Sequence, residues 1–141
     1  MSLAALIAPS DETARAAEIV EAFLVASMIP DPVQAARYVA ADVAITFTGG
    51  RKFAHPREST AFNAKRYKWV KKKMERTDVV AGTGETIVYN LGTLYGEWPD
   101  GTAFDGNRYV DRFVVRDGKI VKMDVWNDSA ERLLTRHGIE A

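Results

Sequence analysis

The residue whose chemistry most needs an explanation is Asp111, within the stretch NRYVDRFVVRDGKIVKMDVWND at positions 107–128. Alternate side chains of an extended strand share one face, and this places Asp111 beside Tyr109 and Phe113 on an apolar face. Burying a carboxylate there costs free energy unless its surroundings compensate. We therefore predict that Asp111 is the acid, base or hydrogen-bond anchor of a pocket. The alternative is a structural carboxylate with buried partners.

Three uncharged polar residues fall on the same face as Asp111. Asn107 and Tyr109 belong to its strand, and Asn127 belongs to the next strand. We predict that they line the pocket and hold an oxygen atom of a ligand. The other interpretation is that they complete a buried polar network with Asp111.

Three side chains outside this stretch are further candidates for the pocket. His55 lies in a predicted loop, where it is either a general base or an ordinary surface histidine. Trp98 ends a predicted strand beside a turn, and it forms either the pocket rim or part of the packing of that turn. Tyr67, on the third predicted helix, either faces the cavity or is exposed.

Composition limits the partners and the chemistry. The chain has 141 residues, with 19 basic and 19 acidic side chains and no cysteine. We interpret it as a single domain, 1–141, in which residues 1–9 form a loose arm. Balanced charge gives no reason to expect nucleic acid or an anionic membrane as partner. The lack of cysteine excludes disulfides, thiolate metal sites and a cysteine nucleophile.

The sequence contains no phosphate-binding loop, catalytic triad or cluster of metal ligands, so we expect no cofactor and no metal. No segment approaches the roughly 18 consecutive apolar residues that span a bilayer. The N-terminus lacks the pattern of a signal peptide. We therefore expect a cytoplasmic protein without a membrane partner.

Three helices are predicted in the first half of the chain, at about 10–29, at 31–40, and from Pro56 to near Lys73. Asp31 is the predicted N-cap of the second, with Gln34 three residues later. The lysine-rich segment 68–73, KWVKKK, is interpreted as the solvated end of the third helix rather than as an anion or nucleic-acid patch.

Strands are predicted at 43–48, 74–81, 86–98, from Thr102 with a bulge at Asp105-Gly106, and in the 107–128 hairpin, with a loop at 51–55. The hairpin turns at Asp117-Gly118, a pair that tolerates the positive φ of a two-residue turn. A last helix begins at Asp128, its predicted N-cap, and ends before Gly138. Helices followed by a run of strands predict an α+β fold, with helices packed on one face of a curved antiparallel or mixed sheet.

The opposite face of the hairpin is unusually apolar for a solvent-exposed surface. We predict that it forms the interface of a homodimer. The predicted interface residues are Val110, Arg112, Val114, Ile120 and Trp126.

The element order and the tail RYVDRFVVRDGKIVKMDVWND at 108–128 resemble the nuclear transport factor 2-like superfamily, in particular its SnoaL-like group. The resemblance implies a cone-shaped partial barrel of the cystatin-like α+β type, with a pocket at its open end and often a homodimer. The superfamily includes ketosteroid isomerase, SnoaL-type polyketide cyclases, scytalone dehydratase and limonene epoxide hydrolase.

For three of these enzymes, this chain lacks a residue that the enzyme's chemistry requires. Asp111 matches the position where ketosteroid isomerase keeps a protonated aspartic acid as an oxyanion donor. That enzyme's general-base aspartate would fall near Thr46, where the chain has no carboxylate. The Arg and Asp pair of limonene epoxide hydrolase is replaced by Leu91-Gly92-Thr93. The histidine pair of scytalone dehydratase is absent too, because the only histidines are His55 and His137.

We therefore predict a small-molecule pocket protein that takes a hydrophobic, oxygen-bearing ligand of ring-system size. If the protein is an enzyme, we expect a cofactor-free isomerase, cyclase or dehydratase in which Asp111 transfers or donates a proton. The alternative is a non-catalytic dimer that binds a ligand or another protein.

Overall fold

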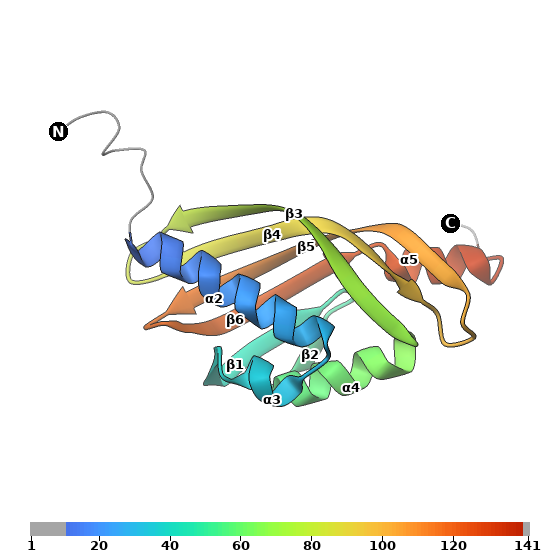
Figure 1. Ribbon diagram of the computed structural model, residues 1–141, viewed down its shortest axis with the longest axis horizontal. Coiled ribbons are helices and arrows are strands. Elements are labelled where there is room, and N and C mark those ends of the chain that lie inside the picture. Colours follow the sequence, from blue (N-terminus) through green and yellow to red (C-terminus); the bar gives the residue numbers. More distant parts are fainter. Residues whose placement is uncertain (1–10, 140–141) are drawn as a thin grey trace.

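The computed structural model describes residues 11–139 (Figure 1). The predicted loose arm, 1–9, lies outside the described residues. The helices are α2 (Asp11–Met28), α3 (Pro32–Ala36), α4 (Pro56–Arg66) and α5 (Ser129–Arg136). The strands are β1 (Val39–Phe47), β2 (Arg51–Phe53), β3 (Trp69–Ala81), β4 (Thr86–Glu97), β5 (Ala103–Arg116) and β6 (Lys119–Asn127).

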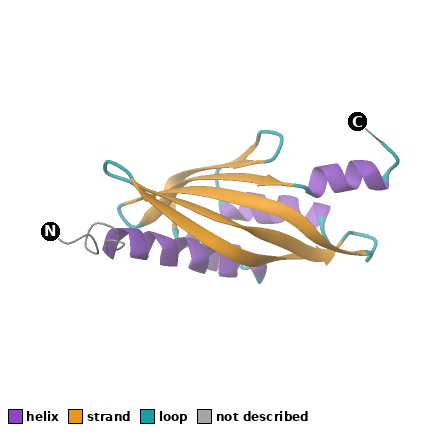
Figure 2. Ribbon diagram, turned by 90° about the horizontal axis from the view of Figure 1, so that it is seen from above, coloured by secondary structure: helices purple, strands orange, loops and turns teal. Residues whose placement is uncertain are grey.

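The strands of the described chain form one six-stranded sheet in the order β2-β1-β6-β5-β4-β3. All neighbours pair antiparallel except β1 and β6, which are parallel. The sheet curves over α2, α3 and α4 without closing (Figure 1). Seen from above, α5 projects beyond the end of the long strands (Figure 2). The structure confirms the predicted α+β class and the curved mixed sheet.

The hairpin of β5 and β6 forms as predicted. Asp117 and Gly118 both have positive φ, 49° and 74°, which is the geometry of a two-residue hairpin turn. The register pairs Tyr109 with Asn127 and Asp111 with Val125. These side chains therefore share the concave face of the sheet, which packs against the helices.

An irregularity near this turn changes the predicted outer face. The register shifts between Val114 and Val115, so that Val115 pairs with Ile120. Ile120 consequently turns into the core and is 0% exposed, and Val114 is buried as well. The assignment of Ile120 to an outer interface was wrong, because strict alternation ignores a bulge.

The predicted third helix is also shorter than expected. α4 ends at Arg66, and the chain from Trp69 is the edge strand β3, paired with β4. Two glycines permit this pairing: a Cβ on Gly92 would lie 2.0 Å from the Lys73 carbonyl oxygen, and one on Gly96 would lie 2.1 Å from that of Trp69. The lysine-rich segment is therefore part of the sheet and not a helix end.

Three smaller predictions have different outcomes. Asp31 caps α3 as predicted, its carboxylate accepting a hydrogen bond from the Gln34 N–H at 3.0 Å. The predicted 51–55 loop contains the short strand β2, which pairs with β1. Asp128 precedes α5, but its side chain makes no capping bond and instead accepts one from Arg108 Nε at 2.7 Å.

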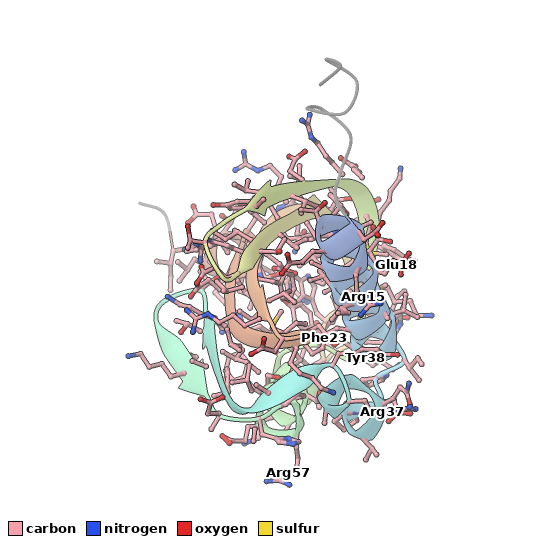
Figure 3. The ribbon with its side chains drawn as sticks, turned by 90° about the vertical axis from the view of Figure 1, so that its left-hand side faces the viewer. Arg15, Glu18, Phe23, Arg37, Tyr38 and Arg57 are labelled. Atoms are coloured by element: carbon pink, nitrogen blue, oxygen red, sulfur yellow. The ribbon has the colours of Figure 1, made fainter. Side chains whose placement is uncertain are left out.

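The core lies between α2 and the concave face of the sheet. Phe23 on α2 packs edge-on against Phe113 on β5, with ring centroids 5.9 Å apart. Figure 3 shows Phe23 between the helix and the strands. The fully buried Val20 and Leu24 belong to the same cluster. This packing fixes the position of the C-terminal end of α2 relative to β3 and β6. A cavity remains between these three elements.

Candidate functional site

A cavity of about 400 Å³ lies between the end of α2, α4, the start of β3 and the concave face of β6. Small-molecule sites commonly occupy about 300–1,000 Å³. Its apolar lining includes Phe23, Leu24, Met28, Phe47, Met123 and Val125. Polar groups reach the lining from Asn63, Asn127 and Tyr67. The charged residues in the described lining are the lysines Lys68, Lys71 and Lys72, without a carboxylate.

One side of the cavity carries an ion pair that the sequence analysis did not predict. Lys72 Nζ lies 2.9 Å from Asp111 Oδ2 and 4.1 Å from the centroid of the Tyr109 ring. Lys72 lines the cavity, whereas Asp111 is 0% exposed and lies behind it. Burial raises the pKa of Asp111 above its usual range, and the nearby ammonium of Lys72 only partly opposes this.

A chain of hydrogen bonds holds Tyr109 in place. Its hydroxyl donates to Asn90 Oδ1 at 2.7 Å, and the Asn90 amide donates to Thr77 Oγ1 at 3.0 Å. Thr77 in turn donates to Glu21 on α2 at 3.2 Å. Burial, with a further contribution from the charge of Asp111, raises the pKa of Tyr109, so this phenol stays neutral. Tyr109 is thus a fixed support for the ion pair rather than part of the cavity lining.

A second polar cluster connects Asn107 with Tyr67. Ser129 Oγ accepts hydrogen bonds from the Tyr67 hydroxyl at 2.6 Å and from Asn107 Nδ2 at 3.2 Å. Tyr67 lines the cavity, whereas Asn107 is fully buried. Asn107 Oδ1 has no hydrogen-bond partner among the described residues. Asn127 does line the cavity, and its Oδ1 accepts the Ser129 N–H at 3.1 Å.

The remaining two candidates lie away from the cavity lining. Trp98 is buried and stacks on Phe104 and Tyr67, with centroids 4.3 and 5.6 Å away. It therefore supports Tyr67 from behind. His55 is the N-cap of α4, where its Nδ1 accepts a hydrogen bond from the Arg57 N–H at 3.0 Å. Of the predicted site residues, the structure thus brings Asn127 and Tyr67 to the cavity itself.

Lys72 is the group that sequence reasoning missed. The signal was present in the alternation of Val70 and Lys72, which share one face if segment 68–73 is extended. The helix predicted from Pro56 to near Lys73 had assigned these residues to a helix instead. The glycines of β4 were the second signal, because they allow close approach of a neighbouring backbone.

Residues 11–139 contain neither a metal-binding cluster nor a membrane-spanning helix. No group of three or more His, Asp or Glu side chains there could hold a metal ion. No helix in this range is long and apolar enough to cross a membrane.

Comparisons with known proteins identify relatives by structure and not by sequence. No protein-family model matches the chain, and no curated protein sequence matches it. A provisionally assigned SnoaL-like polyketide cyclase from Jannaschia sp. CCS1 superposes with a TM-score of 0.70 at 16% identity, covering 90% of this chain and 94% of that one. TerC, co-crystallized with polyporic acid, gives a TM-score of 0.67 at 15% identity, covering 90% and 99%.

A third solved structure is also similar to this chain. A provisionally assigned ketosteroid isomerase from Shewanella frigidimarina NCIMB 400 gives a TM-score of 0.64 at 16% identity, covering 79% of this chain and 94% of that one. Identities this low show a shared fold and do not establish a shared activity. The protein has the nuclear transport factor 2-like fold.

Proposed function

We propose that the protein binds a hydrophobic, oxygen-bearing molecule of ring-system size and acts on it by cofactor-free acid–base chemistry, as an isomerase, cyclase or dehydratase. The observation that carries this proposal is the ion pair between Lys72 and the buried Asp111 at the wall of an apolar cavity of about 400 Å³. Titratable groups whose pKa is shifted by burial are concentrated at functional sites. The chemistry named for two of the similar structures, cyclisation and isomerisation, is of the same kind.

The arrangement of the pair suggests how a proton would move. A raised pKa allows Asp111 to accept a proton near neutral pH more readily than an exposed carboxylate does. Lys72 separates Asp111 from the cavity. A proton therefore leaves the ligand in one of two ways: to the Lys72 amine after its ammonium has given a proton to Asp111, or to Asp111 itself after Lys72 has moved aside. Asn127 and Tyr67 are placed to orient the ligand.

The proposal is tested by proton exchange at carbon. Enolisable bicyclic ketones such as 2-tetralone are incubated with the protein in D2O, and deuterium incorporation next to the carbonyl is followed by NMR. We expect exchange above the protein-free rate, reduced by about 100-fold or more in Asp111→Asn. Lys73→Gln, a change on the opposite face of β3, serves as the control. If the ketones bound without deuterium exchange, the protein would be a ligand carrier and not an enzyme of this kind. If they did not bind, the pocket function would be rejected.

A second candidate function, assembly with a second copy, is favoured by the outer face of the β5–β6 hairpin. Val110 and Trp126 are paired across these strands and are 39% and 52% exposed. Neighbouring Arg112 and Asp124 lie 3.9 Å apart and are mostly buried, which leaves the apolar pair prominent. We propose that this surface forms a homodimer. Sedimentation equilibrium should give a dimer that Trp126→Glu converts to a monomer; a monomeric wild-type protein would reject this candidate.

A further inference from the structure

The Lys72 ammonium has an N–H donor without a partner among the described residues. An ammonium carries three N–H donors. Lys72 Nζ forms an ion pair with Asp111 Oδ2 at 2.9 Å, and the centroid of the Tyr109 ring lies 4.1 Å from Nζ. Among the described residues, Lys72 Nζ has no further partner. The side chain is 16% exposed and lines the cavity, so the remaining donor is available to a ligand there.

Asp111 itself cannot make that contact in this arrangement. Both of its oxygens are buried, and the residue lies behind Lys72 rather than in the lining. Its position, together with the hydrogen-bonded Tyr109, holds the ammonium against the cavity wall. In this arrangement Asp111 does not contact a bound ligand directly but holds Lys72, which does.

The charges around the cavity favour one sign of ligand. All charged residues in its described lining are lysines. Lys68 has only a distant ion pair, 3.9 Å from Glu97, and Lys71 is exposed. A lining with positive charges and no carboxylate attracts anions and excludes cations.

We propose that the ligand is a hydrophobic organic anion, with a carboxylate, enolate or phenolate oxygen, and that Lys72 is the residue that contacts this oxygen. The inference rests on the proposed pocket function and specifies its substrate class. Acid–base chemistry that passes through an enolate would use the same contact, because Lys72 would stabilise the developing negative charge.

A pair of fluorescent probes separates charge from hydrophobicity. 8-Anilinonaphthalene-1-sulfonate is anionic, its sulfonate replacing the ligand's charged oxygen, whereas N-phenyl-1-naphthylamine has the same rings without the sulfonate. Affinities for both are measured by fluorescence titration at low ionic strength. Folding of every variant is checked by circular dichroism and thermal melting. The wild-type protein should bind the anionic probe more tightly than the neutral one.

The variants then assign the contact. Removing Lys72 alone leaves a buried unpaired carboxylate and endangers folding, so the main variant is Lys72→Met with Asp111→Asn, which removes both charges. This variant should bind the anionic probe about tenfold more weakly, and its affinity for the neutral probe should change by less than about twofold. Lys73→Gln removes one lysine from the opposite face of β3 and should change neither affinity.

Asp111→Asn alone distinguishes the two members of the pair. The ammonium of Lys72 loses its counter-charge, so the anionic probe should bind at least about threefold more tightly. Weaker binding of the anion would show that Asp111, not Lys72, serves the ligand, and would overturn the inference. If the double variant lost equal affinity for both probes, the proposed contact between Lys72 and the anion would be overturned. The binding of probes by the wild-type protein would still support the pocket function. If the wild-type protein bound neither probe, the pocket function itself would fail.

Discussion

Lys72 on β3 reaches across β4 to place its Nζ 2.9 Å from Oδ2 of Asp111 on β5. The two residues lie on strands that do not pair with each other, so the contact spans the strand β4 between them. This contact turns an isolated buried carboxylate into an ion pair whose cationic member faces the cavity.

Removing one partner of the ion pair should destabilise the protein more than removing both partners. Lys72→Met leaves an unpaired buried carboxylate and should lower the free energy of unfolding by about 3 kcal/mol. The double variant with Asp111→Asn should lie within about 1 kcal/mol of the wild type. Urea denaturation of the four proteins of this cycle measures the coupling. A loss in the double variant equal to the sum of the losses in the two single variants would mean that the pair carries no coupling energy.

The pH dependence of stability should reveal Asp111. Burial raises the pKa of Asp111 in the folded state above its ordinary value of 3.8. The folded protein then holds a proton that the unfolded chain has released, so this group makes stability fall as pH rises above about 4. Asp111→Asn lacks this effect. The free energy of unfolding of the variant relative to wild type should therefore increase as the pH rises above about 4; a difference that does not change with pH would contradict the raised pKa of Asp111.

Gly92 should be essential for the position of β3. A Cβ at this residue would lie 2.0 Å from the Lys73 carbonyl oxygen, so Gly92→Ala must move the β3 backbone. We expect a loss of roughly 2–3 kcal/mol in the free energy of unfolding, together with weaker binding of the anionic probe. Thr93→Ala, on the next residue of β4, is the matched control. A Gly92→Ala protein with wild-type stability and probe affinity would show that close approach is not required.

The two faces of the hairpin should respond differently to truncation. Ile120→Ala removes methyl groups from the core and should cost about 2–5 kcal/mol in the free energy of unfolding. Val110→Ala changes an exposed position and should cost less than about 0.5 kcal/mol, while weakening self-association if the proposed dimer forms. Chemical denaturation and sedimentation give the two readouts. Similar losses for both variants would contradict the inward turn of Ile120.

Local sequence patterns determined much of the fold. The Asp117-Gly118 turn, the Asp31 cap and the alternation in β5 depend on dihedral preferences and on neighbours a few residues away. These features could be predicted because such preferences act within the segment itself. They were sufficient to place Asp111 on a buried face, and the element order was sufficient to indicate the α+β class.

The tertiary structure alone decided that Lys72 belongs to the site. Segment 68–73 has good helix formers, yet its pairing with β4 makes it a strand, because hydrogen bonds to a glycine-containing neighbour outweigh a weak local preference. That pairing brings Lys72 to Asp111, and a register shift of one residue turns Ile120 inward. Such contacts join residues far apart in the chain. Their energies depend on the partner strand, and for that reason the ion pair and the cavity emerge only from the folded molecule.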